Sequence, residues 1–200
     1  MKVRWSRGAV LLSLGVALAG CASLPRAGLE ARQFPITVDY GQALGDLIRS
    51  GNYQWVYSEV NPGNFPPSGT GSRAETAWLV RLNPVVPIDS LVAGQKALGR
   101  HPADLRELLT FGRMYPDVQR SASIVGFGSW RVYPTITYVN FGPAPMAQWT
   151  VRAFENFYPT LIHNLLGRSV VLIQEDQIPD YDTPGFFACF LQDAPGPGGG

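Results

Sequence analysis

The sequence predicts an α+β fold in which a mostly antiparallel sheet carries about three short helices packed on one side. The helical patterns lie in the first part of the chain, whereas aromatic and β-branched runs separated by Gly and Pro follow Tyr115 and Pro116. Hydrophobic residues make up 46% of the 200 residues and charged residues 16%, a composition that supports a folded core. The 22 Gly and 17 Pro favour short elements.

The first helix is expected at 42–50, where four apolar residues share one face and Gly51 follows as a C-terminal cap. A second helix is expected from Asp89 or Ser90, either of which can cap it, to Leu98, with Gly99 ending it.

The third helix is expected to restart directly after His101. Pro102 suits the first helical position, and Asp104 would lie near the positive end of the helix dipole. Three leucines at 105, 108 and 109 give this helix a buried face, and Gly112 is expected to stop it after Phe111.

The remaining elements are expected to be strands, because they combine aromatic and β-branched residues and are bounded by turn residues. The Pro- and Gly-rich stretch 61–72 is expected to be a loop. The expected strands are 53–60, 77–82, 123–127, 135–141, 149–154 and 169–175.

The N-terminus has the pattern of an export signal. Lys2, Arg4 and Arg7 precede the apolar run AVLLSLGVALAG, which at about 12 residues is too short to span a bilayer. The run ends in Leu-Ala-Gly-Cys at 18–21, which resembles the bacterial lipoprotein box. The resemblance implies that residues 1–20 are a signal peptide and that Cys21 is acylated. The alternative is an ordinary signal peptide with a chance cysteine at its end.

Acylation would place the protein in the cell envelope, because two or three acyl chains give stable anchoring to a membrane. Ala22 stands where lipoproteins retained at an inner membrane commonly carry Asp, so in a cell with two membranes we expect the outer one. The expected organisation is a tether at 21–33, a globular domain at 34–192 and a disordered Pro/Gly tail at 193–200.

The charge balance excludes a nucleic-acid partner. The chain has 16 basic and 15 acidic residues, and removal of 1–20 would leave 13 basic and 15 acidic, a net charge of −2. The helix pair at 89–111 is therefore not interpreted as a DNA-binding motif. Two cysteines cannot form a disulfide framework, and in GFFACFL we expect Cys189 to be a buried thiol.

Two segments resemble a widespread group of short, uncharacterised bacterial proteins. GNYQWVYSEVNPGNFP at 51–66 is similar to the group's GxYDWVN…I…ENFP opening. LRELLTFGRMYPDVQRSASIVGFGSW at 105–130 is similar to its LEELLAFGxxYPDLQRxxPIVALGS segment. The group carries no assigned activity, so the resemblance implies no site residues.

Catalytic candidates are few. The two histidines are His101, for which a role at the start of a helix is sufficient explanation, and His163, which lies in the apolar segment TLIHNLLG. The string 126–130 lacks the G-x-S-x-G pattern of a nucleophile elbow and is expected to be a turn at a strand end. A periplasmic hydrolase that uses His163 with a distant carboxylate remains the alternative function.

No metal or cofactor is expected from these patterns. The loop QEDQIPDYDTPG offers oxygen ligands for Ca²⁺, but its spacing is not that of an EF-hand and a solvated acidic loop explains it; its acidic residues are Glu175, Asp176, Asp180 and Asp182. The two histidines lie far apart and the chain has no CxxC, which argues against a transition metal.

The aromatic residues favour a binding function. The tryptophans beyond the signal segment are accompanied by eight tyrosines, and flat aromatic surfaces suit sugar or peptide ligands even though most must pack in the core; these tryptophans are Trp55, Trp78, Trp130 and Trp149. We therefore expect a membrane-anchored, non-enzymatic module that binds an envelope protein or a glycan.

Overall fold

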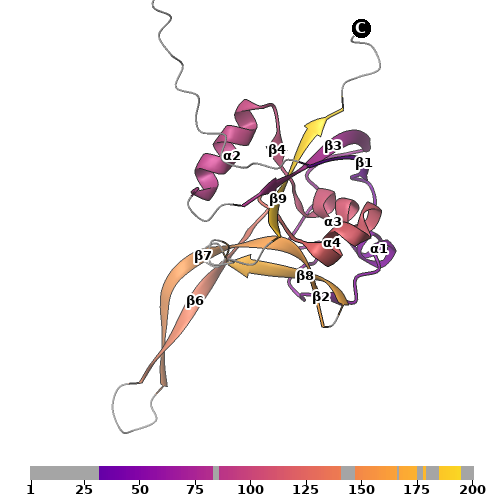
Figure 1. Cartoon of the computed structure of the whole chain (residues 1–200). Coiled ribbons are helices and arrows are strands. Elements are labelled where there is room, and N and C mark those ends of the chain that lie inside the picture. The colour runs from indigo at the N-terminus through magenta and orange to yellow at the C-terminus, as the bar shows by residue number, and fades with distance from the viewer. Residues whose placement is uncertain are drawn as a thin grey trace, which may run out of the picture.

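The computed structural model describes residues 32–82, 86–140, 147–165, 167–174, 178 and 185–194. This part contains nine strands and four helices (Figure 1). The strands are β1 (Arg32–Asp39), β2 (Trp55–Val56), β3 (Ser72–Arg81), β4 (His101–Pro102), β5 (Ser123–Gly126), β6 (Arg131–Asn140), β7 (Ala147–Asn164), β8 (Gly167–Gln174) and β9 (Phe186–Asp193). The helices are α1 (Leu44–Ser50), α2 (Ile88–Ala97), α3 (Leu105–Met114) and α4 (Pro116–Ser121).

The strands form one sheet in the order β1-β3-β9-β5-β7-β8-β2, with β4 beside β9 and β6 beside β7. Only the β2–β8 and β5–β9 pairs in the described residues are parallel, so the predicted α+β fold with a mostly antiparallel sheet is confirmed. β6 and the adjoining half of β7 form a ribbon that projects away from the helices (Figure 1).

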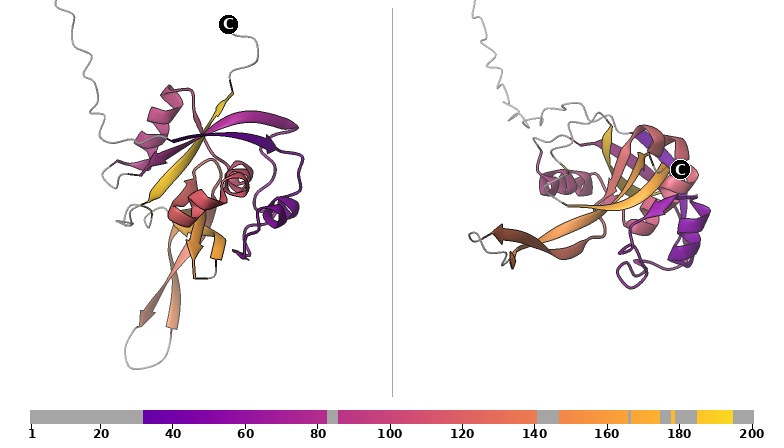
Figure 2. Two further views of the ribbon diagram at one scale, coloured as in Figure 1. Left: turned by 45° about the vertical axis from the view of Figure 1, so that its right-hand side comes forward. Right: turned by 90° about the horizontal axis from the view of Figure 1, so that it is seen from below.

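Both faces of the sheet are covered, which differs from the expected one-sided packing. Alternate residues of β9 point to opposite faces, so that Cys189 packs with α3 whereas Ala188 and Phe190 belong to the cluster on the other face. α1, α3 and α4 lie on the first face and α2 on the second (Figures 1 and 2). Helix α2 packs on that second face through the partly buried side chains of Ile88, Leu91 and Val92.

Several boundaries differ from the sequence expectation. The aromatic run 53–60 contributes only β2, because the Val60 N–H bonds back to the Tyr57 carbonyl at 2.9 Å and turns the chain. β1 begins at Arg32, so the last two residues of the expected tether belong to the sheet, and β9 extends to Asp193. Neither β1 nor β9 was expected as a strand, and α4 is an additional helix that starts with Pro116.

Gly112 lies inside α3 and does not stop it. A Cβ atom at this position would lie 2.3 Å from the Tyr53 hydroxyl and 2.6 Å from a Leu161 methyl carbon. The glycine is therefore required for the close approach of α3 to the sheet, and the helix continues to Met114.

Cys189 is fully buried, as expected, and burial raises the pKa of its thiol, which stays protonated. None of the helices that the structure describes is both long enough and apolar enough to cross a membrane. Residues 1–31, including Cys21, and the acidic residues Glu175, Asp176, Asp180 and Asp182 lie outside the described residues.

A buried arginine joins the helices to the sheet. Arg168 of β8 is 8% exposed, and its guanidinium donates to the carbonyls of Gly51 and Gly112 and to the Gln119 side-chain oxygen. It also lies 4.8 Å from the ring centre of Tyr53. Among the described residues it forms no ion pair with a carboxylate, so carbonyl dipoles near the ends of α1 and within α3 compensate its charge.

Replacing Arg168 by Met should lower the free energy of unfolding by about 3 kcal/mol, because buried carbonyl groups would lose their donor. Urea unfolding measures this loss. Arg120→Met is the matched control, since Arg120 is exposed and forms a surface ion pair with Asp117, and it should change stability by no more than about 0.5 kcal/mol. Equal losses in the two variants would contradict the assigned role.

Candidate functional site

The start of α3 is a buried capping box. The Glu107 N–H donates to Asp104 Oδ1 at 2.9 Å, and the Asp104 N–H donates to Glu107 Oε2 at 2.7 Å. Pro102 is not the first helical residue, as the sequence suggested, because it pairs with Phe190 in β9. Asp104 is therefore the N-cap, and the helix begins at Leu105.

The segment that follows β5 packs directly against the capping box. A Cβ atom on Gly128 would lie 2.3 Å from the Pro102 carbonyl oxygen, so only glycine fits. The Gly128 N–H donates to the Ala103 carbonyl at 2.8 Å, and the Leu105 N–H donates to Ser129 Oγ at 3.0 Å. The expected turn at 126–130 is present, and its serine stabilises the N-terminus of a helix.

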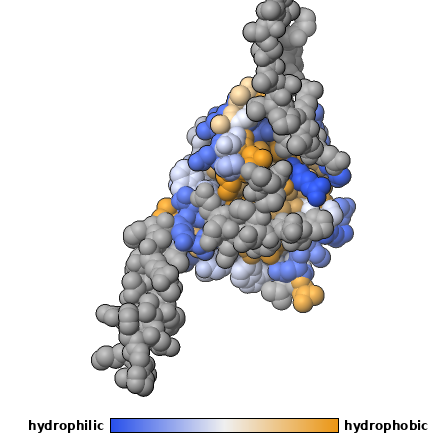
Figure 3. Space-filling view, turned by 60° about the vertical axis from the view of Figure 1, so that its left-hand side comes forward, coloured by the Kyte–Doolittle hydropathy of each residue, from blue (hydrophilic) through white to orange (hydrophobic). Residues whose placement is uncertain are grey.

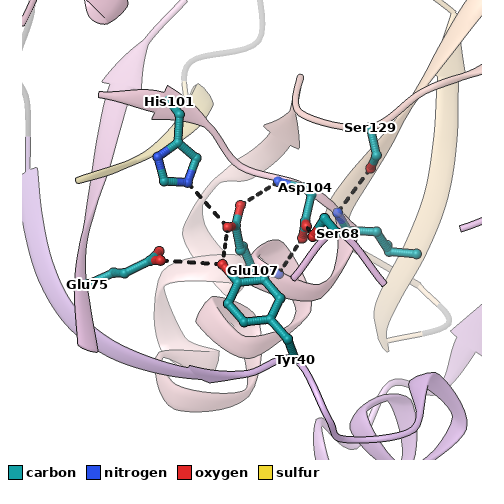
Figure 4. A network of polar contacts seen from close by, with 8 residues as sticks. Tyr40, Ser68, Glu75, His101, Asp104, Glu107 and Ser129 are labelled. Carbon is teal, nitrogen blue, oxygen red and sulfur yellow. Dashed lines mark hydrogen bonds and ion pairs between the residues drawn. The ribbon is translucent and has the colours of Figure 1, made fainter. Parts of the chain in front are cut away.

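The second oxygen of Glu107 is the centre of a polar cluster (Figure 4). Glu107 Oε1 accepts a hydrogen bond from the Tyr40 hydroxyl and lies 3.2 Å from His101 Nε2. The Tyr40 hydroxyl also lies 3.3 Å from Glu75 Oε1. Residues from the end of β1, from β3, from β4 and from α3 therefore meet at one point.

Burial controls the charges of this cluster. Glu75 is only 2% exposed, and desolvation together with the nearby Glu107 charge raises its pKa. Desolvation and Glu107 likewise raise the pKa of Asp104. Burial also acts to raise the pKa of Glu107, but hydrogen bonds from His101, Tyr40 and the Asp104 N–H outweigh it and lower that pKa. The hydrogen bond with Glu107 raises the pKa of His101.

The cluster opens onto a hollow of about 310 Å³. Its lining includes Tyr40, Ser68, Arg73, His101 and the carboxylates of the capping box. The nitrogen of His101 and one oxygen each of Glu75 and Glu107 lie within 4.8 Å of one another. This arrangement is able to hold a cation or to pass a proton between His101 and Glu107.

A second hollow, of about 460 Å³, lies on the α2 side of the same segment and shares Pro102 and Gly128 with the first. Phe127, Tyr158 and the 54% exposed Trp130 give it an aromatic wall. Its remaining described lining combines apolar and polar side chains and comprises Ile88, Asp89, Val92, Lys96 and Asn156. Figure 3 shows the α2 side of the molecule, where apolar residues are exposed between hydrophilic ones.

His163 lies elsewhere. It is exposed and lines a further hollow with Arg113, Arg120 and Arg168, far along the sheet from His101. Within the described part of the chain, no carboxylate lies within hydrogen-bond distance of its ring and none lines this hollow. Among the residues that the structure describes, His163 therefore has no carboxylate partner of the kind that a hydrolase would need.

The tryptophans separate into packed and exposed residues. Trp78 packs against the α2-side core, and the Arg100 guanidinium lies 3.4 Å from its ring centre. Trp55 is 39% exposed beside Tyr57, on β2 at the edge of the sheet. The side chain of Trp149 is outside the described residues.

From the sequence, a role at the start of a helix was sufficient to explain His101, whereas the structure places it in β4 beside acidic partners that sequence reasoning missed. Two signals were available. Asp104 and Glu107 have the spacing of a capping box, and Glu75 lies on the same strand face as the buried Ala77 and Leu79. A carboxylate on the buried face of a strand indicates a partner inside the protein. Tyr40 carries no such signal.

Comparisons with known proteins add no relative. A scan against protein-family models, a search of curated proteins and a search of solved structures each find no match to this chain.

Replacing Glu75 by Gln should stabilise the metal-free protein at neutral pH. The folded-state pKa of Glu75 is raised, so burying its charge destabilises the folded protein. This cost is absent below the unfolded-state pKa, where Glu75 is protonated in both states, and it grows as pH rises toward and through the folded-state pKa. Gln carries no charge, so the melting temperature should exceed that of the wild type at pH 7 and converge with it at low pH. About 2–4 °C is expected for each kcal/mol of relieved repulsion.

Thermal melts from pH 4 to pH 8 in chelator measure this difference. Asp117→Asn is the control, since Asp117 is exposed and forms a surface ion pair with Arg120. A Glu75→Gln protein that is less stable than the wild type at pH 7 would show that the buried Glu75 charge and its repulsion by Glu107 do not destabilise the fold.

Proposed function

We propose that this protein is a lipid-anchored module of the cell envelope that binds a glycan without chemical turnover. The anchor is Cys21, in the outer membrane of a cell with two membranes, and the binding surface is the aromatic hollow beside Trp130. The observation that carries the binding proposal is the exposed indole of Trp130 on the rim of a hollow walled by Phe127 and Tyr158.

The anchor rests on the order of features at the N-terminus. A basic start, a short apolar run and Leu-Ala-Gly-Cys at 18–21 follow one another as export and acylation require. The mature chain would carry a net charge of −2, so the acyl chains and not a basic patch would hold it at the membrane.

The hollow favours a glycan over a protein partner. A concave site of about 460 Å³ has the size of a small-ligand site, whereas stable protein interfaces bury about 1,200–2,000 Å² over a broad surface. The flat face of an indole packs against the C–H face of a sugar ring. Asp89, Lys96 and Asn156 place polar groups beside the aromatic wall, where hydroxyl groups need partners.

Replacing Cys21 by Ser should abolish incorporation of labelled palmitate and leave an uncleaved precursor or a soluble form, because only the thiol accepts the lipid. Labelling in growing cells followed by gel fluorography measures this. Cys189→Ala is the control and should keep the label, since that thiol is buried in the sheet. An acylated Cys21→Ser product would exclude the anchor.

Replacing Trp130 by Ala should weaken co-sedimentation with purified cell-wall glycan at least tenfold, which corresponds to about 1.4 kcal/mol. Trp55→Ala is the matched control, because Trp55 is also exposed but lies on β2, away from the hollow, and it should bind as the wild type does. Two results together would contradict the glycan proposal and indicate a protein partner. They are the absence of glycan binding and the capture of one protein at this hollow by in-cell cross-linking.

A further inference from the structure

We propose that Glu75, His101 and Glu107 form a binding site for a divalent transition-metal ion, with Zn²⁺ as the fitting ion, whose remaining coordination position faces the hollow lined by Tyr40, Ser68 and Arg73. This site is separate from the aromatic hollow and does not depend on the glycan proposal.

The positions of the ligand atoms suit one ion. Zn²⁺ bonds to oxygen and nitrogen at about 2.0–2.2 Å, which places the ligand atoms of a tetrahedron about 3.3–3.6 Å apart. His101 Nε2 and Glu107 Oε1 are 3.2 Å apart, and the three ligand atoms all lie within 4.8 Å of one another. Figure 4 shows the three side chains converging from β3, β4 and α3.

An unpartnered atom points to a missing ligand. Glu75 is 2% exposed, and its Oε2 atom is buried and has no hydrogen-bond partner among the described residues. A buried carboxylate oxygen that lacks a donor costs free energy unless a cation or a proton satisfies it. Its other oxygen lies 3.3 Å from the Tyr40 hydroxyl, at the long end of the hydrogen-bond range.

The local charge balance also favours a bound cation. Glu75, Asp104 and Glu107 lie together in the interior, whereas the nearby basic groups are His101 and, at the hollow, Arg73. Like charges buried together repel one another, and a dication between Glu75 and Glu107 would neutralise both.

The donor set distinguishes among metals. Ca²⁺ and Mg²⁺ take oxygen ligands, whereas an imidazole nitrogen with two carboxylates suits Zn²⁺ and its first-row neighbours. Glu107 is also oriented by a second hydrogen bond, because the Asp104 N–H donates to its Oε2 at 2.7 Å and leaves Oε1 directed at His101. Three protein ligands leave one tetrahedral position for water or a ligand atom in the hollow.

Calorimetric titration of the full-length, chelator-stripped protein in detergent with Zn²⁺ alone tests the site. One ion should bind per chain, and Glu75→Gln and His101→Gln should each weaken binding at least tenfold. Neither residue is part of the capping box, and Glu75→Gln is expected to be more stable than the wild type, so lost binding would not reflect misfolding. His163→Ala, which alters the other histidine, should bind Zn²⁺ as the wild type does.

Three results would overturn the proposal. One is the absence of stoichiometric Zn²⁺ binding to the wild type. Another is equal Zn²⁺ affinity in the wild type, Glu75→Gln and His101→Gln. The third is Ca²⁺ binding as tight as that of Zn²⁺ and unchanged in His101→Gln, which would make the cluster an all-oxygen site. None of these measurements involves the glycan, so failure of one proposal leaves the other standing.

Discussion

The burial of the Glu107 carboxylate is the constraint on which the site depends. One of its oxygens accepts the Asp104 N–H and closes the capping box of α3, while the other meets Tyr40 and His101. A single side chain therefore fixes where α3 begins and where β4 and the end of β1 lie against it. A buried charge with this many partners is costly to remove, because each donor would lose its acceptor.

The two hollows are organised by the same short segment. His101 and Pro102 pair with β9, and the backbone of residues 102–104 lies close to Gly126 and Gly128. Pro102 and Gly128 line both hollows, so the same backbone segment separates the carboxylate cluster from the aromatic side chains around Trp130. A lipid-tethered domain with this arrangement would present a ligand surface and a metal site supported by the same backbone hydrogen bonds.

The sequence predicted the fold class and the approximate spans of the first two helices, because periodicity and terminal glycines are local signals. The expected cap of the second helix was wrong, since Pro87 precedes α2 and neither Asp89 nor Ser90 caps it. The sequence placed the end of α3 wrongly because Gly112 is needed for packing against Tyr53, a contact that joins distant parts of the chain. The predicted absence of a metal site followed from the lack of a CxxC or clustered histidines. Glu75, His101 and Glu107 come from three elements, and only the pairing of β3 and β4 with β9 brings them together. The spacing of Asp104 and Glu107 is that of a capping box, but spacing alone does not indicate that both carboxylates are buried.

The most direct measurement is an anomalous difference map at the zinc absorption edge from crystals of the protein grown with Zn²⁺. We predict one strong peak within bonding distance of His101 Nε2 and of one oxygen each of Glu75 and Glu107. A map with no peak at this cluster, or with its strongest peak at His163 or on the surface, would contradict this prediction.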